Sequence, residues 1–382
     1  MKYCADPLSI LAFIFAVFAL VGVVQSAIGA RLTERFCAMP RQRSQKRPPV
    51  TIMKPLCGVD LMAELALESF FLLDYPDYQL VFGVQDAQDP VLEIVARLRA
   101  RYPERDTVLM VNDTLHGTNR KVSNLINMQP LAKHEIIVFS DADIHVPPYY
   151  LDDLVAALEE PGVGLVTTLY TGLPGAGELP ARLGAAQINQ TFLPSALLAR
   201  KLGRQDCMGA TMAITKGILA QSGGLLALAN HLADDQVLGR RVIKAGYKVG
   251  LARNIPAATV PEVSFAALLR HELRWARTIR ALVPFAYAGS ILQFPLFWGI
   301  LAVLISGFSA WSLVLLCFIL AGRVVFARQI EGALRLPKTR GIWLFLLRDL
   351  FSLIIYVESF TGRRVDWRGQ SMVADSGQPT SG

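Results

Sequence analysis

Three groups of carboxylates mark this sequence, each at the end or the start of an apolar segment. They are Asp86, the pair Asp141 and Asp143, and the pair Asp234 and Asp235. Carboxylate oxygens are the ligands that hard divalent cations prefer, and such a cation can hold and neutralise a diphosphate. Each group also has a simpler explanation. The first two could form solvated turns, and the third could open a helix, whose dipole favours acids in its first turn.

Basic and aromatic residues accompany these acids. Lys54 ends an apolar strand pattern, and Lys121 lies in a polar segment that opens a helix. In the helical pattern at 268–280, the spacing puts three arginines on one face, which are Arg270, Arg274 and Arg277. Simpler roles exist here too. Lys121 could be solvated, the arginines of residues 270–280 could meet lipid phosphates, Arg277 and Arg280 above all, and Trp275 could be an interfacial aromatic.

The elements that must position these residues alternate between strands and helices. Strands are expected at 50–54, 79–84, 107–111, 136–139, 163–170 and 210–215. Helices are expected at 61–73, at 91–101, from the segment 115–124 to about 131, at 179–201 (as one helix or two), after 236 and at 268–280. This alternation predicts an α/β domain with a mostly parallel sheet. Acids at the carboxyl ends of its strands would lie where open α/β sheets bind their ligands.

The composition indicates a soluble domain held by membrane segments. Hydrophobic residues make up 53% of the 382 residues, charged residues make up 18%, and the formal net charge is +7. With no nucleic-acid-binding motif, this charge favours an anionic membrane surface as a partner and argues against nucleic acid. The five cysteines are odd in number and show no Cys-x-x-Cys spacing, which argues against a disulfide framework or a zinc site. The histidines at 116, 145 and 231 are expected to be structural.

Apolar segments at both ends predict membrane anchors. Residues 7–30 are long enough to cross a hydrocarbon core of about 30 Å, and the basic residues that follow predict a cytoplasmic location for the chain after residue 30. Residues 282–322 contain no charged side chain. The expected divisions are an anchor at 1–31, a basic linker at 32–48, a catalytic domain at 49–281, two transmembrane helices at 282–327, an interfacial or packed helix with a basic segment at 328–370, and a disordered tail at 371–382.

Several motifs resemble those of membrane-bound GT-A glycosyltransferases of the family 2 type, in the ceramide glucosyltransferase-like branch. They are Lys54-Pro-Leu-Cys-Gly-Val-Asp60, Asp74-Tyr-Pro-Asp77, Asn119-Arg-Lys-Val-Ser-Asn-Leu125, Ser140-Asp-Ala-Asp143, Ala233-Asp-Asp235 and His271-Glu-Leu-Arg-Trp275. A narrower resemblance is to the hopanoid-biosynthesis glycosyltransferases. It is carried by Val84-Gln-Asp86, Gly164-Leu-Val-Thr-Thr-Leu-Tyr170, Gly209-Ala-Thr-Met212 and the segment 270–280. His271 departs from the family pattern, which has Gln or Arg there, and Asp234 stands where Glu is usual.

The resemblance implies a GT-A domain and an inverting, metal-dependent transfer of a sugar from a UDP-sugar to a membrane lipid. The expected products are GlcNAc on a bacteriohopanetetrol-type hopanoid or, alternatively, glucose on ceramide. A bacterial inner membrane with the catalytic domain facing the cytoplasm is the expected location. A processive polysaccharide synthase would need more membrane helices for a channel, and a non-catalytic scaffold or transporter would need polar sites within its spans.

The resemblance also implies roles for individual residues. Lys54 and Asp86 would face the uridine, and Lys121 would lie near the nucleotide or its phosphates. Asp143 and Asp141 would hold Mn²⁺ or Mg²⁺. Asp235, with Asp234 as its neighbour and competitor, would be the catalytic base. Arg274 would pair with the diphosphate, Trp275 would line the acceptor end, and His271 or Arg270 would fill the Gln/Arg position.

Overall fold

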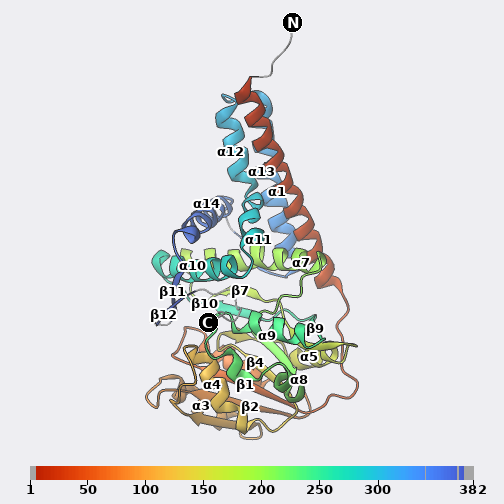
Figure 1. Ribbon diagram of the computed structural model, residues 1–382, viewed down its shortest axis with the longest axis vertical. Helices are drawn as coiled ribbons and strands as arrows, with labels where there is room; N and C mark the ends of the chain where they lie inside the picture. Colours follow the sequence, from red (N-terminus) through yellow and green to blue (C-terminus); the bar gives the residue numbers. More distant parts are fainter. Residues whose placement is uncertain (1–5, 340, 368–369, 374–382) are drawn as a thin grey trace.

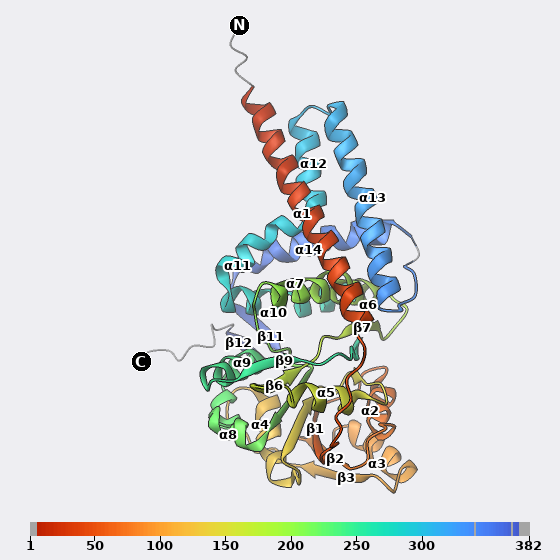
Figure 2. The same ribbon diagram turned by 90° about the vertical axis from the view of Figure 1, so that its right-hand side faces the viewer.

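The protein is described here from a computed structural model, in which residues 6–339, 341–367 and 370–373 are described. The chain is arranged in three tiers: a β-sheet domain at one end, a layer of helices across the middle and a helical bundle at the other end (Figure 1). A view turned by 90° shows the same order along the long axis (Figure 2). The three tiers therefore separate the sheet domain from the apolar bundle by a layer of helices.

The central sheet has seven strands among the described residues, in the order β3-β2-β1-β4-β8-β6-β9. All pairs among the first four of these are parallel, β8 is antiparallel to both neighbours, and β6 and β9 are parallel. The strands are β1 Val50–Leu56, β2 Tyr78–Val84, β3 Asp106–Val111, β4 Ile136–Ser140, β6 Val163–Thr167, β8 Thr211–Thr215 and β9 Lys248–Leu251. The mostly parallel α/β sheet predicted from the alternation is confirmed.

Helices cover both faces of this sheet, because alternate residues of each strand point to opposite faces. Along β2, Leu80 and Phe82 belong to one core cluster and Val81 to the other. The first cluster is completed by α2 Ala63–Phe71, α3 Val91–Arg101 and α5 Tyr150–Leu158. The second is completed by α4 Arg120–Met128, α8 Lys216–Gln221, η3 Leu225–Leu228 and α9 Asp234–Lys244. A 3₁₀ turn, η1 Gln129–Leu131, ends the α4 segment.

A second, three-stranded sheet was not expected from the sequence. Its order is β5-β10-β7, with β5 Ile144–His145, β10 Ala257–Val260 and β7 Thr171–Pro174. The predicted strand at 163–170 is in fact shorter, because β6 ends at Thr167 and the chain resumes as β7 in the second sheet. Strands of two to four residues are too short to show a period of two in the sequence, so they could not be predicted from it.

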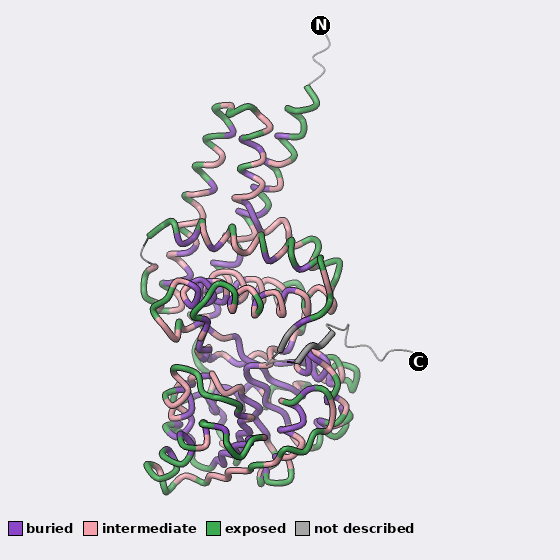
Figure 3. The backbone as a smooth tube through the Cα atoms, turned by 90° about the vertical axis from the view of Figure 1, so that its left-hand side faces the viewer, coloured by how far each residue is buried: buried purple, intermediate pink, exposed green. Residues whose placement is uncertain are grey.

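The middle tier contains four helices and one π-helical turn. They are α6 Leu179–Gln187, the π-helical η2 Ile188–Phe192, α7 Leu193–Lys201, α10 Phe265–Leu282 and α14 Trp343–Glu358. In Figure 2, α7, α10 and α14 run across the long axis of the molecule, at the level of the lower parts of α1 and α13. Burial is concentrated in the sheet domain, whereas much of the bundle is exposed (Figure 3).

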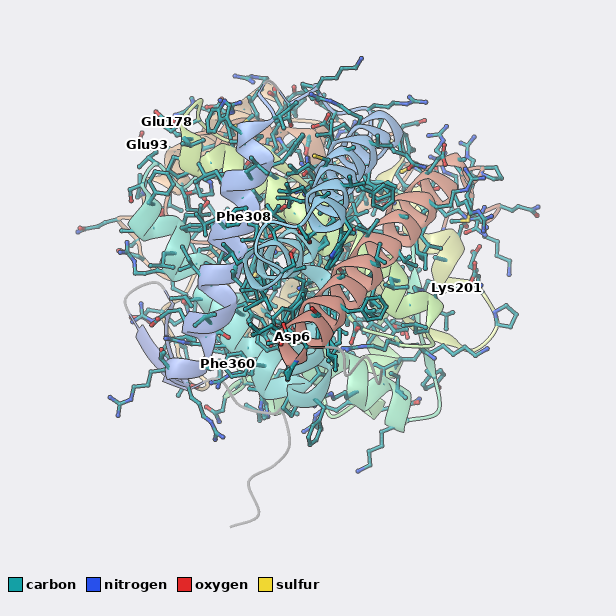
Figure 4. All side chains as sticks on the ribbon, turned by 90° about the horizontal axis from the view of Figure 1, so that it is seen from above. Asp6, Glu93, Glu178, Lys201, Phe308 and Phe360 are labelled. Atoms are coloured by element: carbon teal, nitrogen blue, oxygen red, sulfur yellow. The ribbon has the colours of Figure 1, made fainter. Side chains whose placement is uncertain are left out.

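The bundle contains two helices that are long and apolar enough to cross a membrane, α1 Pro7–Ala38 and α13 Ala310–Ala333, among the described residues. A third span would need the segments 284–293 (α11 Pro284–Gly289 with η4 Ser290–Gln293) and α12 Pro295–Ile305 together, which meet at a 61° bend. Helix α1 continues to Ala38, so the first part of the predicted linker at 32–48 is helical. Phe308, labelled in the view from above, lies in the turn between α12 and α13 (Figure 4).

The C-terminal segment returns to the sheet domain. Helix α14 packs against α6 and α10, and after η5 Ser359–Thr361 the chain forms a hairpin of β11 Arg364–Trp367 and β12 Gln370–Val373. Arg277 donates to the carbonyl of Arg364 at 2.8 Å, and Val365 packs with Leu232 of the sheet domain. Residues 371–373 therefore belong to a strand and not to the predicted disordered tail, whose remainder, 374–382, lies outside the described residues.

Candidate active site

The carboxyl ends of β1, β2 and β4 lie side by side at one edge of the central sheet, because the three strands are parallel. Asp141 and Asp143 follow β4, as the alternation predicted. Asp86 follows β2, but it is exposed, and its carboxylate accepts a hydrogen bond from the backbone of Gln88 at 2.8 Å. This is the turn role that the sequence left open for Asp86, and a contact of Asp86 with the uridine stays a prediction.

Lys54 lies in β1 and is fully buried. Its ammonium donates to the carbonyl oxygen of Asp141 at 2.7 Å and lies 3.6 Å from the centroid of the Phe70 ring. Burial lowers the pKa of Lys54 to about 7, although the negative charges of Asp143 and Asp141 act to raise it. Lys54 thus holds the turn that carries the two acids.

Lys121 joins two of the three acidic groups. Its ammonium lies 2.6 Å from Asp141 Oδ1 and 3.9 Å from Asp234 Oδ2. Burial opposes the charge of Lys121, but the carboxylates of Asp141 and Asp234 outweigh it and raise the pKa above its usual value. A positive charge is therefore held between the turn after β4 and the start of α9, which excludes the solvated role considered for Lys121.

Asp143 lines a small hollow beside the loop that follows β1. Cys57, Gly58 and Asp60 also line this hollow. Burial, followed by the charge of Asp141, raises the pKa of Asp143 to about 6. An acid with a raised pKa in a hollow is a candidate for a functional group, because a cation bound there would favour its charged form.

Asp234 and Asp235 open α9 as the sequence predicted, but they differ in burial. Asp234 is buried, and its Oδ1 accepts a hydrogen bond from Asn119 at 3.5 Å. Asp235 is partly exposed and lies against Gly209, where an added Cβ would come within 3.0 Å of Asp235 Oδ2. Burial, with the charge of Asp234 as the second cause, raises the pKa of Asp235 to about 7. Of the two acids, Asp235 is the one that an acceptor hydroxyl could approach.

Helix α10 carries the remaining predicted residues. His271 bonds through Nδ1 to Glu262, and its ring meets the ring of Trp275 edge to face at a centroid distance of 4.5 Å. This bond to His271 keeps the pKa of Glu262 below its usual value, although burial acts in the opposite direction. Trp275 packs against the core formed by α6, η2 and β10 and is only partly exposed. Its position between helices differs from the lipid-facing belt considered as an alternative.

Arg274 lies within electrostatic reach of Tyr170 and Glu262. Its charge acts on Tyr170, whose pKa is raised by burial and by Asp143, Asp235 and Asp141 in that order. It also acts on Glu262. Tyr170 therefore lies between the acidic groups of the sheet domain and the arginine of α10.

Further arginines on α10 have a role that the sequence did not predict. Arg277 and Arg280 bond to carbonyl groups of the C-terminal segment, at Arg364 and at Gly362 respectively. They had been considered as partners of lipid phosphates. In the structure they hold the segment that follows α14 against α10.

A divalent cation would be compatible with Asp141 and Asp143. The described residues contain no group of three or more His, Cys, Asp or Glu side chains that could hold a metal. Two carboxylates nevertheless suit Mg²⁺ or Mn²⁺, because such ions are commonly bound by one or two carboxylates together with substrate phosphates. The predicted structural histidines agree with this arrangement: His145 bonds to Thr259 at 2.8 Å and His116 to Asn127 at 2.7 Å.

Four residues of this region were given no role from the sequence, although three of them, Asn119, Tyr170 and Gly209, stand in the quoted motifs. Asn119 caps α4 by accepting from the backbone of Val122 at 3.1 Å and also binds Asp234. Tyr170 directly precedes β7, Glu262 follows β10, and Gly209, two residues before β8, lies against Asp235. Asn119 begins a quoted motif and could have been recognised as a helix cap from its type. Tyr170 and Gly209 stand in quoted motifs that implied no role for them, and Glu262 carries no local signal.

Comparison with known proteins identifies the family and the fold. Residues 14–380 match the profile of Glycosyl transferase family 21. Ceramide glucosyltransferase 3 from Caenorhabditis elegans is 25% identical over 342 residues, covering 84% of this chain and 72% of that protein. A ceramide glucosyltransferase from Komagataella phaffii is 32% identical over 113 residues, covering 28% of this chain and 22% of that protein.

Among solved structures, a mannosyltransferase from Pyrobaculum calidifontis, in complex with GDP-Man and Mn²⁺, superposes with a TM-score of 0.55. It is 18% identical, and the match covers 93% of this chain and 99% of the other. This likeness confirms the predicted GT-A fold. The match extends over the helices of the middle tier and the bundle as well as over the sheet domain.

Proposed function

The chain belongs to glycosyl transferase family 21, and from that membership we propose that it moves a sugar from a UDP-sugar to a hydroxyl group of a membrane lipid. One observation carries the proposal. The ammonium of Lys121 lies 2.6 Å from Asp141 and 3.9 Å from Asp234, so a single partly buried cation links the acids after β4 to the acids of α9. A transferase that inverts in one displacement needs a diphosphate site and a base on opposite faces of the anomeric carbon, and Lys121 connects the acids proposed for these two sites.

Asp235 is the proposed base. It is more exposed than Asp234, and its pKa of about 7 lets it accept a proton near neutral pH while remaining largely available in the charged form above that pH. Asp234 is committed to Asn119 and lies near Lys121, so its role is to orient Lys121. The base would remove the proton of the acceptor hydroxyl as that oxygen attacks the anomeric carbon and UDP departs.

The donor would be bound by residues from both halves of the sheet domain. Lys54 and Asp86 are proposed to lie at the uridine, and Arg274 is proposed to pair with the diphosphate, which suits its planar guanidinium group. Asp143 and Asp141 would hold Mn²⁺ or Mg²⁺. When bound, the cation would supply charge neutralisation for the diphosphate and for the leaving UDP. The presence of Mn²⁺ in the Pyrobaculum calidifontis mannosyltransferase supports a divalent ion.

The acceptor would reach the site from the membrane. Helix α10 carries Trp275 and His271 in the tier between the sheet domain and the candidate spans α1 and α13. Two or three membrane helices offer little wall for a polymer channel, which favours a single transfer to a lipid over a processive synthase. The proposed location is the bacterial inner membrane, with the sheet domain in the cytoplasm, based on the basic residues that follow residue 30.

Two acceptors are supported by different observations. The narrower motif resemblance, including Val84-Gln-Asp86, supports GlcNAc transfer to a bacteriohopanetetrol-type hopanoid. The ceramide glucosyltransferases among the relatives support glucose transfer to ceramide. The hopanoid is our first candidate and ceramide the second.

An assay of sugar transfer by the purified, detergent-solubilised protein tests both candidate acceptors, the hopanoid and ceramide. UDP-GlcNAc or UDP-glucose would be supplied with Mn²⁺ or Mg²⁺ and with either lipid, and the products would be read by mass spectrometry. Asp235→Asn is expected to abolish transfer while UDP still binds. Asp106→Asn is the matched control, since Asp106 is an exposed acid paired with Lys133 at the start of β3. Transfer to neither lipid by a protein that binds UDP-sugar would refute the lipid acceptor.

A further inference from the structure

We infer that a cavity between the candidate membrane spans and the middle tier holds the hydrocarbon part of the lipid acceptor, which gives this lipid a binding site separate from the acidic cluster. The inference rests on the proposed function. The cavity has a volume of about 310 Å³ and is lined by α1, α7, α12, α13 and α14. Its volume lies at the lower end of the range of roughly 300–1,000 Å³ that is usual for ligand pockets.

The position of the cavity makes it accessible to a lipid. Among the described residues, both helices that could cross a membrane, α1 and α13, contribute to its wall, and so does α12, which packs against both. Ile300 on α12 and Leu350 on α14 line the cavity with 43% and 55% of their surface exposed. Large apolar side chains that are exposed and also line a cavity mark a place where hydrocarbon can enter from outside the protein.

The polar end of the cavity selects against phospholipids. Arg323 donates to both carboxylate oxygens of Asp349, at 3.0 and 3.2 Å, and to Gln190 Oε1 at 3.0 Å. The guanidinium group of Arg323 is therefore bonded to the carboxylate of Asp349 and to the amide oxygen of Gln190. Arg323 and Asp349 together carry no net charge. A phosphate group would have to displace Asp349, whereas a lipid whose polar part is uncharged, with hydroxyl or amide groups, would leave the pair intact.

A single helical turn connects this cavity to the proposed active site. The π-helical η2 presents Gln190 and Thr191 to the cavity. On the same turn, Phe192 packs against Tyr170 at a ring-centroid distance of 5.0 Å, and Tyr170 lies within electrostatic reach of Asp235. Isolated π-helical turns occur frequently at functional sites.

The π-helical turn is also anchored to the second sheet. Asn189 bonds to both the N–H and the C=O of Gly172 in β7, at 2.8 and 3.0 Å. Ile188 packs with Trp275 in one core cluster. A lipid lying in the cavity would therefore have its polar end beside the segment that contacts Tyr170 and Trp275, which orients its hydroxyl group toward the acids.

Photo-cross-linking tests the inference independently of turnover. The full-length protein in phosphatidylcholine nanodiscs would receive a ceramide with a diazirine near the end of its acyl chain, and labelled peptides would be mapped by mass spectrometry. We expect labelling on α12 and α14, reduced by unlabelled ceramide or bacteriohopanetetrol but not by added phosphatidylcholine. Ile300→Trp and Leu350→Trp should fill the cavity and reduce the labelling about tenfold.

Two further variants serve as matched controls. Leu304→Trp and Ile354→Trp each place the same ring four residues further along α12 or α14, at exposed positions that do not line the cavity. They should label like the unsubstituted protein. In transfer assays, the cavity variants should raise the KM for the lipid by about tenfold and leave the KM for the UDP-sugar unchanged.

The outcomes separate this inference from the proposed function. Equal labelling of cavity and control variants, or competition by phosphatidylcholine, would overturn the inference while sugar transfer by the unsubstituted protein upholds the function. Absence of transfer to any lipid by the unsubstituted protein would overturn the proposed function, and with it the identity of the occupant as an acceptor.

Discussion

Arg348 of α14 and Glu272 of α10 form a bidentate ion pair inside the protein. Nη1 lies 2.7 Å from Glu272 Oε1 and Nη2 lies 2.8 Å from Oε2, and both side chains are almost fully buried. Arg348 also donates to the carbonyl of Leu183 in α6 at 3.2 Å. The pair therefore ties three helices of the middle tier together. It lies one residue from His271 and two from Arg274, so it also sets the position of the residues proposed to meet the substrate.

Replacing only one partner of the Arg348–Glu272 ion pair should destabilise the protein strongly. Arg348→Met would leave the carboxylate of Glu272 buried without a partner, at an expected cost of about 3–5 kcal/mol. Thermal unfolding of the detergent-solubilised protein would measure the loss. The double variant Arg348→Met with Glu272→Gln should recover part of it, since no buried charge then remains unpaired. Arg97→Met, at an exposed ion pair with Glu64, should change the melting temperature little. If Arg97→Met lowered the melting temperature as much as Arg348→Met, burial would not be the reason that the Arg348–Glu272 pair is costly to break.

The rate of sugar transfer should fall as the pH is lowered below about 7. The pKa of Asp235 is raised to about 7, and its protonated form cannot act as a base, so kcat/KM should decrease by about tenfold per pH unit below that value. Asp234→Asn removes the neighbouring charge that contributes to the raised pKa, so the acid limb should move to lower pH. A pH–rate profile of both proteins checks this. An acid limb unmoved by Asp234→Asn would argue against Asp235 as the base.

UDP binding should depend on a divalent ion through Asp143. Calorimetry with Mn²⁺, and again after EDTA treatment, should show the affinity of the unsubstituted protein for UDP falling by about tenfold or more, which corresponds to about 1.4 kcal/mol. Asp143→Asn should bind UDP weakly under both conditions. Asp106→Asn should behave like the unsubstituted protein. Mn²⁺-dependent binding that persists in both Asp143→Asn and Asp141→Asn would place the metal elsewhere.

Gly209 should be sensitive to the addition of a single methyl group. An added Cβ would lie 3.0 Å from Asp235 Oδ2 and 3.3 Å from Asp235 Cγ, so the carboxylate would have to move by a few tenths of an ångström. We expect Gly209→Ala to lower kcat roughly tenfold while UDP affinity is retained, because the base would be displaced from its position of attack. Gly177→Ala is the control, since an added Cβ there meets nothing within 4 Å. Unchanged kcat in Gly209→Ala would show that the carboxylate has room to adapt.

The regular part of the fold could be predicted from local patterns. Strands β1, β2 and β4 and helix α3 follow from apolar runs and helical spacing, because each is long enough for its period to be visible. The second sheet could not be predicted in this way, because β5, β7 and β10 have two to four residues and pair with strands distant in sequence. The same limit applies to the C-terminal hairpin, which depends on bonds from Arg277 and Arg280.

For the active site, the sequence by itself determined the chemical groups and the strands and helices that carry them. Acids after β4 and at the start of α9, a lysine at the start of α4 and an Arg-Trp pair on α10 all follow from residue type and spacing. Only the tertiary structure decided how they are arranged. Burial commits Asp234 to Asn119 while Asp235 stays open, and Lys121 joins acids that are twenty and more than one hundred residues away. Burial and long-range contact depend on how the elements pack, and no local pattern in the chain records them.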